Sequence, residues 1–341
     1  MKIRNVMSLF NGMSCGNIAL DRAGIEFKTY YSSEVDKYAN IVTQANYPET
    51  VQLGDVTKWR EWSIDWASID LLIGGSPCQG FSFAGKQLAF DDPRSALFFE
   101  YLNILNHIKT VNPDVKFLLE NVKMKKESRA VITSMLKVEP VFINSALVSA
   151  QNRQRYYWAS WEFGQPEDKG IVLSDVIEKN LPSCNVGLAV RNKSKCIRVG
   201  GRNSPFGSKQ ELDSPYIKTD KKLSVKNNQT KASCLTGGAN SGGNHSDMDI
   251  LVIQKGRGNN PGGLRALDGK TPAMTSCSWE HNNHVLTDEL VRRFSVTECE
   301  RLQTLPDFYT QNKGVSNSQC YKMLGNGWTV SVIAHIFSSL K

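Results

Sequence analysis

Short apolar runs alternate with amphipathic, helix-like stretches over the first 161 residues. The runs that predict strands are 6–9, 29–32, 71–73, 117–120, 142–148 and 156–161. The stretches that predict helices are 16–23, 37–46, 94–108 and 131–136. Strands alternating with helices at this spacing predict an α/β fold with a mostly parallel, doubly wound sheet covered on both faces. In such sheets, ligands bind at the carboxyl ends of the strands.

The pattern changes between residues 178 and 287, where Gly, Asn, Ser and Lys dominate and only short apolar runs such as 250–253 occur. Regular structure returns at Ser295, which forms a capping box with Glu298 at the start of a helix that stops before Pro306. A last helix has an apolar stripe made of Val330, Ile333, Phe337 and Leu340. We therefore expect a domain at 1–177, an inserted region at 178–287, and a segment at 288–341 that returns to the first domain.

The positive charge is concentrated in the inserted region. The chain has a net charge of +8, and residues 179–270 contain 16 Lys and Arg against 6 Asp and Glu, a local balance of +10 that leaves about −2 for the rest. Such a concentration is typical of a surface that meets phosphates. A solvated basic face without a partner is the alternative.

Composition excludes several classes of protein. With 40% hydrophobic and 22% charged residues, the chain is neither disordered nor fibrous. No stretch approaches the roughly 20 apolar residues of a membrane span, and the N-terminus runs into a strand rather than a signal peptide, so we expect a cytoplasmic protein without a membrane partner. The eight cysteines form no Cys-x-x-Cys pair, so neither a zinc site nor a disulfide framework is expected.

The candidate nucleophile is Cys78, in the segment GGSPCQGFS that directly follows the apolar run 71–73. This places a thiol at the carboxyl end of a strand, on a loop bordered by glycines. A cysteine is a plausible covalent catalyst because a fraction of it is thiolate near pH 7. The alternative is a structural cysteine on a Gly/Pro turn.

Further polar groups follow other strands. Glu120 ends the run 117–120, which suggests that it shares a site with Cys78. Arg153 and Arg155 alternate ahead of an aromatic run, and alternating residues of an extended segment point to the same side. Read alone, Glu120 could be a helix cap or a surface acid, and the arginines could be solvated on an edge strand.

Residues 7–16 predict a strand, a turn of small residues and a helix start, which lets a ligand approach the backbone closely. The turn lacks the Gly-x-Gly-x-x-Gly pattern, which argues against a nicotinamide-dependent oxidoreductase. Glu34, at the end of the next strand, is placed like the acids that accept hydrogen bonds from ribose hydroxyls. Asp55 follows a third short strand, where it could accept from an amino group.

Taken in order, these segments resemble the DNA cytosine-5 methyltransferase family. The resemblance rests on SLFNG at 8–12, PCQ at 77–79, ENV at 120–122, QNRQR at 151–155 and LGNG at 324–327. It covers roughly residues 1–175 and 288–341. The basic insert then stands where that family has its variable, smaller and mostly β target-recognition domain, and the sheet would be the family's Rossmann-like methyltransferase sheet.

The resemblance implies roles for the strand-end groups. Cys78 would add to C6 of cytosine, Glu120 would protonate or hydrogen-bond N3, and Arg155 would hold the O2 side of the ring, with Arg153 close by. S-adenosylmethionine would supply the methyl group and leave as S-adenosylhomocysteine. Since C5 and C6 cannot be attacked within a base stack, the cytosine would be flipped out of duplex DNA.

The resemblance also implies binding residues. For the cofactor, Phe10 would lie against the adenine, Glu34 on the ribose, Asp55 on the adenine amino group and Leu97 as an apolar wall. The remaining cofactor-binding residues would be Asn11, Gly12, Ser14, Cys15, Gly16, Val35, Val56, Pro77, Asn326 and Gly327, the last two closing the methionine end. The DNA-binding residues would be Gln79, Ser82, Lys86, Arg202 and Arg257, and no metal is implied.

Two positions depart from the usual pattern of bacterial members. Residues 10–16 read FNGMSCG instead of Phe-x-Gly-x-Gly-Gly, and Val35 replaces the usual Trp after the ribose-binding acid. The first change alters backbone contacts to the methionine moiety, and the second weakens stacking on the adenine.

Other functions fit part of the pattern. A tRNA cytosine-5 methyltransferase of the same fold would share Cys78, Glu120 and the arginines, and a catalytically silent DNA-binding relative would keep the fold alone. The long basic insert and the continuation of Cys78 into QGFS favour DNA. We expect a monomer whose partner is duplex DNA, and the resemblance allows a companion restriction endonuclease.

Overall fold

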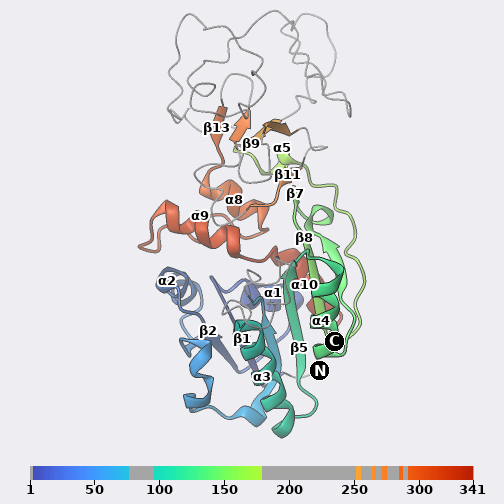
Figure 1. The fold of residues 1–341 in the computed structure, drawn as a ribbon. Coiled ribbons are helices and arrows are strands. Elements are labelled where there is room, and N and C mark those ends of the chain that lie inside the picture. The colour runs from blue at the N-terminus through green and yellow to red at the C-terminus, as the bar shows by residue number, and fades with distance from the viewer. Residues whose placement is uncertain are drawn as a thin grey trace, which may run out of the picture.

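The computed structural model describes residues 3–76, 96–178, 251–254, 263–265, 270–274, 284–286 and 291–340. Its centre is a seven-stranded sheet with the order β3-β2-β1-β4-β5-β8-β6 (Figure 1). The strands are β1 (Asn5–Leu9), β2 (Thr29–Ser33), β3 (Val51–Gln52), β4 (Ile69–Gly74), β5 (Lys116–Val122), β6 (Val141–Asn144) and β8 (Gln154–Ala159). β8 runs antiparallel to both of its neighbours, and the other pairs in the sheet are parallel. The predicted mostly parallel α/β sheet is confirmed.

Helices cover both faces of this sheet. They are α1 (Cys15–Ala23), α2 (Lys37–Asn46) and α10 (Val330–Ser338) on one face, and α3 (Ala96–Val111) and α4 (Lys126–Leu136) on the other. The helices α5 (Leu173–Val176), α8 (Val296–Leu302) and α9 (Asn317–Asn326) lie beyond one end of the sheet (Figure 1). Successive strand residues alternate between two hydrophobic clusters: Val6 and Leu71 pack with α1, α2 and α10, whereas Met7 and Leu72 pack with α3 and α4. This alternation explains why the strands read as continuous apolar runs.

The run 142–148 contains two elements rather than one strand. β6 ends at Asn144, whose side chain accepts a hydrogen bond from the backbone of Ala146 and so caps a short 3₁₀ helix, Ser145–Leu147. An asparagine in this position satisfies the backbone locally and ends the strand. Hydropathy alone does not register the change.

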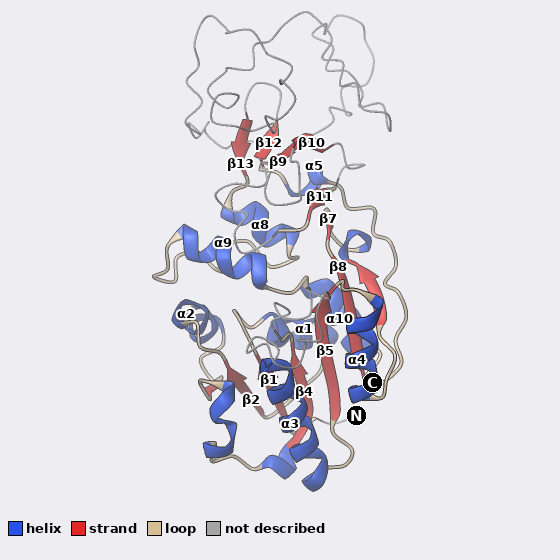
Figure 2. Ribbon diagram, in the orientation of Figure 1, coloured by secondary structure: helices blue, strands red, loops and turns tan. Residues whose placement is uncertain are grey.

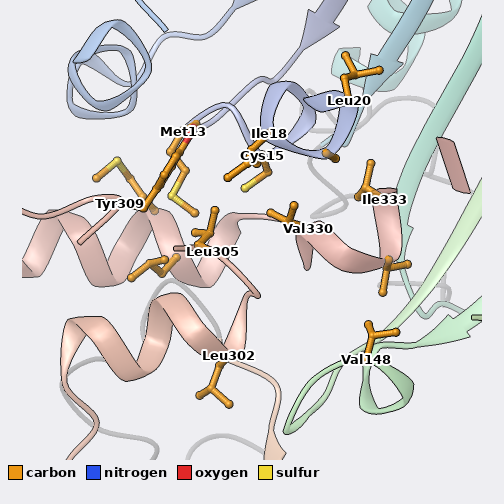
Figure 3. Close-up of a cluster of buried hydrophobic side chains, with 14 of the residues drawn as sticks. Met13, Cys15, Ile18, Leu20, Val148, Leu302, Leu305, Tyr309, Val330 and Ile333 are labelled. Atoms are coloured by element: carbon orange, nitrogen blue, oxygen red, sulfur yellow. The ribbon is translucent and has the colours of Figure 1, made fainter. Parts of the chain in front are cut away.

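The C-terminal segment packs next to the turn after β1. α10 lies against α1, and Figure 3 shows Met13 and Cys15 of the turn facing Leu305, Tyr309 and Val330. The Tyr309 hydroxyl donates to the carbonyl of Met13 at 2.8 Å. Residues nearly 300 positions apart in the sequence therefore build the same end of the molecule.

Three described strands of the inserted region form a second sheet with β13, which follows that region (Figure 2). β9 (Leu251–Gln254) pairs antiparallel with β10 (Gly263–Arg265) and β12 (His284–Leu286), and β12 pairs with β13 (Val291–Arg293). This small antiparallel sheet agrees with the predicted mostly β character. No helix among the described residues is long and apolar enough to cross a membrane.

One part of the insert is joined to the large domain. β11 (Thr271–Pro272) pairs parallel with β7 (Gln151–Asn152), and the Thr271 amide donates to the carbonyl of Ala150 at 2.8 Å. Lys270 Nζ donates to the carbonyls of Ala146 at 2.9 Å and Ser149 at 3.2 Å, and to that of Ile171. These contacts fasten residues 270–274 to the large domain, while the division at 178 and 287 remains a prediction.

Candidate active site

Glu120 is a buried acid near the carboxyl end of β5, with 8% of its surface exposed. Its Oε1 lies 2.8 Å from Arg155 Nε, in an ion pair across the antiparallel β5–β8 ladder. Arg155 Nη1 also donates to the carbonyl of Gln154 at 2.8 Å. A buried, paired carboxyl group on a central strand is neither a helix cap nor a surface acid.

The end of β4 lies next to this carboxyl group. A Cβ on Gly75 would stand 3.0 Å from Glu120 Oε2, so a glycine lets the two strands approach here. Asn121 Nδ2 is 3.4 Å from both the carbonyl and the hydroxyl oxygen of Ser76. The chain therefore leaves β4 towards Pro77 and Cys78 from a point in contact with Glu120. Pro77, Cys78, Gln79, Ser82 and Lys86 themselves lie outside the described residues.

Arg153 has different partners from Arg155. Its guanidinium is 3% exposed and donates to the carbonyls of Met274 at 3.0 Å, Gly325 at 3.3 Å and Gly327 at 2.9 Å. Burial lowers the pKa of Arg153 to about 10, aided by the nearby positive charge of Arg155. Its donors therefore tie β7 and β8 to the insert and to the C-terminal segment. Neither arginine is solvated, and β8 is an inner strand.

Trp328 is a site residue that was not expected from sequence. It directly follows Asn326 and Gly327, is half-buried, and its Nε1 donates to Glu120 Oε2 at 3.1 Å. Glu120 thus has one partner on each carboxyl oxygen. Its position beside the LGNG motif was the available signal, but an indole after a glycine turn is more often a packing residue.

The turn after β1 has an unusual backbone. Phe10, Gly12 and Ser14 have φ values of 57°, 58° and 67°, in the left-handed region that only glycine adopts without strain. The buried Asn11 side chain stabilises the turn by donating to Ser14 Oγ at 3.0 Å and accepting from the Tyr30 hydroxyl at 3.0 Å. A Cβ on Gly12 would meet nothing within 4 Å, so the backbone there faces open space.

Two acids and an apolar side chain lie near this turn. Glu34 accepts from the backbone of Gly12 at 2.8 Å, and from the amides of Val35 and Asp36 at the same distance. Val35 is 72% exposed, an uncovered apolar side chain beside a carboxylate. Asp55 follows β3, and hydrogen bonds from the backbone and hydroxyl of Thr57 lower its pKa.

Several expected cofactor-binding residues turn their side chains into the core. Cys15 is buried, which raises the pKa of its thiol to about 11, and Val56 packs below the sheet. Gly327 approaches the turn closely, because its Cβ would be 2.6 Å from Met13 Cε. Residues such as Cys15, Val56, Asn11 and Ser14 can face a ligand only through their backbone.

The other expected residues are less closely placed. Leu97, in the first turn of α3, is half-buried against the cluster on that face, and Asn326 is exposed at the end of α9. Gly16 packs tightly at the start of α1, where a Cβ would lie 2.5 Å from Ile73 Cδ1. Arg202 and Arg257 lie outside the described residues. Within the described ranges, no group of three His, Cys, Asp or Glu side chains could hold a metal ion.

Comparison with known proteins identifies the family. Residues 4–341 match the family model for C-5 cytosine-specific DNA methylases. The chain belongs to this family. The matched range contains the turn after β1, Glu120, both arginines and the C-terminal motif.

Relatives that the chain matches over nearly their whole length support the assignment. The chain is 28% identical to the type II methyltransferase M.HgiCI of Herpetosiphon aurantiacus, over 100% of this chain and 97% of that protein. It is 26% identical to the orphan methyltransferase M.SPRI of Bacillus phage SPR, over 98% and 97%. Among solved structures, Entamoeba histolytica methyltransferase EhMeth superposes with a TM-score of 0.64 at 16% identity, covering 100% of this chain and 98% of that one.

The C-5 cytosine methylases use S-adenosylmethionine as methyl donor. The turn after β1 fits this cofactor, because Gly12 leaves room at the backbone, Val35 is uncovered, and Glu34 and Asp55 provide acceptor oxygens. A carboxylate has about four lone-pair sites, so Glu34 can accept from a ribose hydroxyl in addition to its backbone donors.

Proposed function

We propose that this methylase transfers a methyl group to C5 of a flipped-out cytosine in duplex DNA through a covalent adduct with Cys78. The observation that carries the proposal is the buried Glu120–Arg155 pair, 2.8 Å apart and next to Gly75, which directly follows β4 and is three residues before Cys78. An acid and a fixed cation beside a nucleophile are what addition to a pyrimidine requires.

The proposed reaction begins with addition of Cys78 to the cytosine ring. The Cys78 thiolate forms a bond to C6, the electrons of the C5–C6 double bond shift towards N3, and N3 takes a proton from Glu120. The ring is then an enamine with a nucleophilic C5, which an unactivated cytosine lacks. After C5 has been methylated, solvent takes the C5 proton, the C5–C6 double bond re-forms as the sulfur–C6 bond breaks, the thiolate leaves, and N3 returns its proton to Glu120.

The paired side chains have separate tasks in this proposal. Arg155 holds the O2 side of the ring and keeps Glu120 oriented, since its Nε faces Oε1. S-adenosylmethionine, when bound, supplies the electrophilic methyl group. Phe10, Val35 and Leu97 would contact its adenine, Glu34 its ribose and Asp55 its amino group, while the backbone at residues 11–16, 56, 77 and 326–327 would line the rest of the pocket.

DNA is the proposed substrate because the family model is that of DNA methylases and because residues 179–270 carry a balance of +10. Positive charge neutralises phosphates and gives affinity without reading sequence. Arg202 and Arg257 belong to this surface in the proposal, with Gln79, Ser82 and Lys86 on the loop after Cys78. The proposed setting is a monomer in the cytoplasm of a prokaryotic or phage-infected cell, and a companion endonuclease is compatible with type II relatives.

The first experiment compares substrates. Purified protein and tritiated S-adenosylmethionine are incubated with unmethylated genomic DNA or with bulk tRNA, and bisulfite sequencing locates the modified cytosines. Label is expected in DNA and not in tRNA. Label in tRNA alone would replace the proposal with a tRNA methyltransferase of the same fold, and label in neither would contradict methyl transfer to nucleic acid.

The second experiment tests the adduct. A duplex with 5-fluorocytosine at the mapped site should trap the wild-type protein, because fluorine cannot leave C5 as a proton does. Cys78→Ala should form no adduct and transfer no methyl group. Cys320→Ala removes another thiol, buried and remote from Glu120, and should still form the adduct. An adduct with Cys78→Ala would rule out this nucleophile.

A further inference from the structure

Trp328 touches both halves of the site without a role in the function proposed above. Its indole Nε1 donates to Glu120 Oε2 at 3.1 Å, across 208 positions of sequence. A Cβ on Gly16, in the first turn of α1, would lie 3.5 Å from Trp328 Cζ3. The indole thus extends from the start of α1, beside the cofactor turn, to the carboxyl group on β5.

Gly75 leaves the space that this ring occupies. A Cβ on Gly75 would stand 2.8 Å from Trp328 Nε1 and 3.0 Å from Glu120 Oε2, closer than real Cβ contacts. The end of β4 therefore admits the indole and the carboxyl group together only because residue 75 has no side chain. The contact is built into the packing of three segments, and it is not a surface side chain resting against an acid.

Glu120 is consequently held from two sides. Arg155 Nε faces Oε1 at 2.8 Å and Trp328 Nε1 faces Oε2 at 3.1 Å. A single contact leaves a carboxyl group free to rotate about its last torsion, whereas an ion pair at one oxygen and a hydrogen bond at the other fix its plane. Each oxygen has two lone pairs, so Oε2 can keep the indole hydrogen bond while it meets a base.

We infer that Trp328 is a positioning residue for Glu120. It orients the carboxyl group for N3 of the target base from the same C-terminal segment that borders the cofactor turn. The inference rests on the function proposed above, since it assumes that Glu120 acts on the base. The orientation of the Glu120 carboxyl group would then depend on the packing of α9 and α10 against α1.

The test uses two matched substitutions. Trp328→Phe keeps an aromatic ring and removes only the N–H donor. Trp161→Phe makes the same change at another half-buried indole of the same cluster, whose Nε1 donates to the carbonyl of Ile336 at 3.0 Å, away from Glu120. A hydrogen bond to a charged group contributes enough for a tenfold effect or more. Trp328→Phe should therefore lower kcat about tenfold or more, with the KM for S-adenosylmethionine within about threefold of wild type.

The control variant should keep wild-type kcat while losing a similar amount of thermal stability. A rise in the cofactor KM with unchanged kcat would assign Trp328 to cofactor binding and overturn the inference. An unchanged or increased kcat would also overturn it, the latter meaning that the indole merely occupies the place of the base.

A double-mutant cycle separates this inference from the proposed function. Glu120→Gln alone should lower kcat strongly, and adding Trp328→Phe should then have little further effect, because the positioned group is gone. Full activity of Glu120→Gln would contradict the proposed function itself. A Glu120→Gln variant with strongly lowered but measurable kcat, in which Trp328→Phe still lowers kcat by the same factor as in the wild type, would contradict only the role of Trp328.

Discussion

Arg153→Met is expected to destabilise the fold, because this guanidinium serves as a tie between segments. The change removes the donor from the carbonyls of Met274 and Gly325, while Gly327 keeps a second donor in Gln303 Nε2 at 3.3 Å. Two orphaned buried carbonyls cost about 2–6 kcal/mol. Relief from burying the charge offsets part of this: a fall in pKa from 12.5 to about 10 corresponds to about 3 kcal/mol. Subtracting the relief from the cost leaves a net loss centred on about 1 kcal/mol, within a range from a gain of about 1 kcal/mol to a loss of about 3 kcal/mol.

Arg153→Lys is a second test of the same guanidinium contacts. Arg153→Lys keeps a buried charge but loses the planar fork of donors, so at pH 7 it should be at least as unstable as Arg153→Met. Burial holds the pKa of the introduced ammonium below its unfolded value. Its penalty is therefore present at low pH, and the stability of the lysine variant relative to wild type should increase as the pH rises from 7 to 10.

Urea unfolding of the variants, followed by tryptophan fluorescence, measures these differences, and methyl transfer is assayed in parallel. Arg155→Met provides the contrast, since Arg155 pairs with Glu120. This substitution should reduce kcat and should shift the unfolding midpoint less than Arg153→Met does. If Arg153→Met unfolds like wild type and only its kcat falls, the guanidinium acts on the base, and its hydrogen bonds to the neighbouring segments do not stabilise the fold.

Two further changes test the cofactor turn and the ion pair at the opposite end of β4. Hydrogen bonds from Thr57 lower the pKa of Asp55, so it stays charged above about pH 4, and Asp55→Asn should weaken cofactor binding about five- to tenfold by calorimetry; an unchanged Kd would exclude its proposed contact. Burial opposes ionisation of Asp70, yet hydrogen bonds from Arg4 lower its pKa. The contribution of Asp70 to folding stability is therefore complete above the pKa of the unfolded state and is lost as the pH falls through the pKa of the folded state. The difference in unfolding free energy between wild type and Asp70→Asn should shrink below about pH 4, and a constant difference would contradict the ion pair's contribution.

The sheet could be predicted from sequence because its strands and helices differ in period. Buried strands such as β1 and β4 read as unbroken apolar runs, and helices between them show spacing near 3.6 residues. The reversed direction of β8 could not be predicted, since an inner strand is apolar in either orientation. The end of β6 depended on one side-chain hydrogen bond from Asn144, which hydropathy does not register.

The acid of the site was predictable and its partners were only partly so. Glu120 follows an apolar run, which marks the carboxyl end of a strand. Trp328 is 208 positions away, and nothing in the local sequence indicates that its indole reaches this acid. For Arg153 and Arg155, alternation predicts a shared side but not that one guanidinium ends among carbonyls and the other at Glu120. The placement of Cys78 remains a prediction.

The fastening of residues 270–274 has a practical bearing on chimeras. Lys270 and Met274 lie within the expected insert, yet their contacts are with Ser149, Gln151 and Arg153 of the large domain. A graft that exchanges the whole of 178–287 would import foreign partners for these host groups. A transplant of recognition loops that retains the host's own residues 270–274 keeps these contacts. The preference for a DNA sequence could then be exchanged without destabilising the large domain.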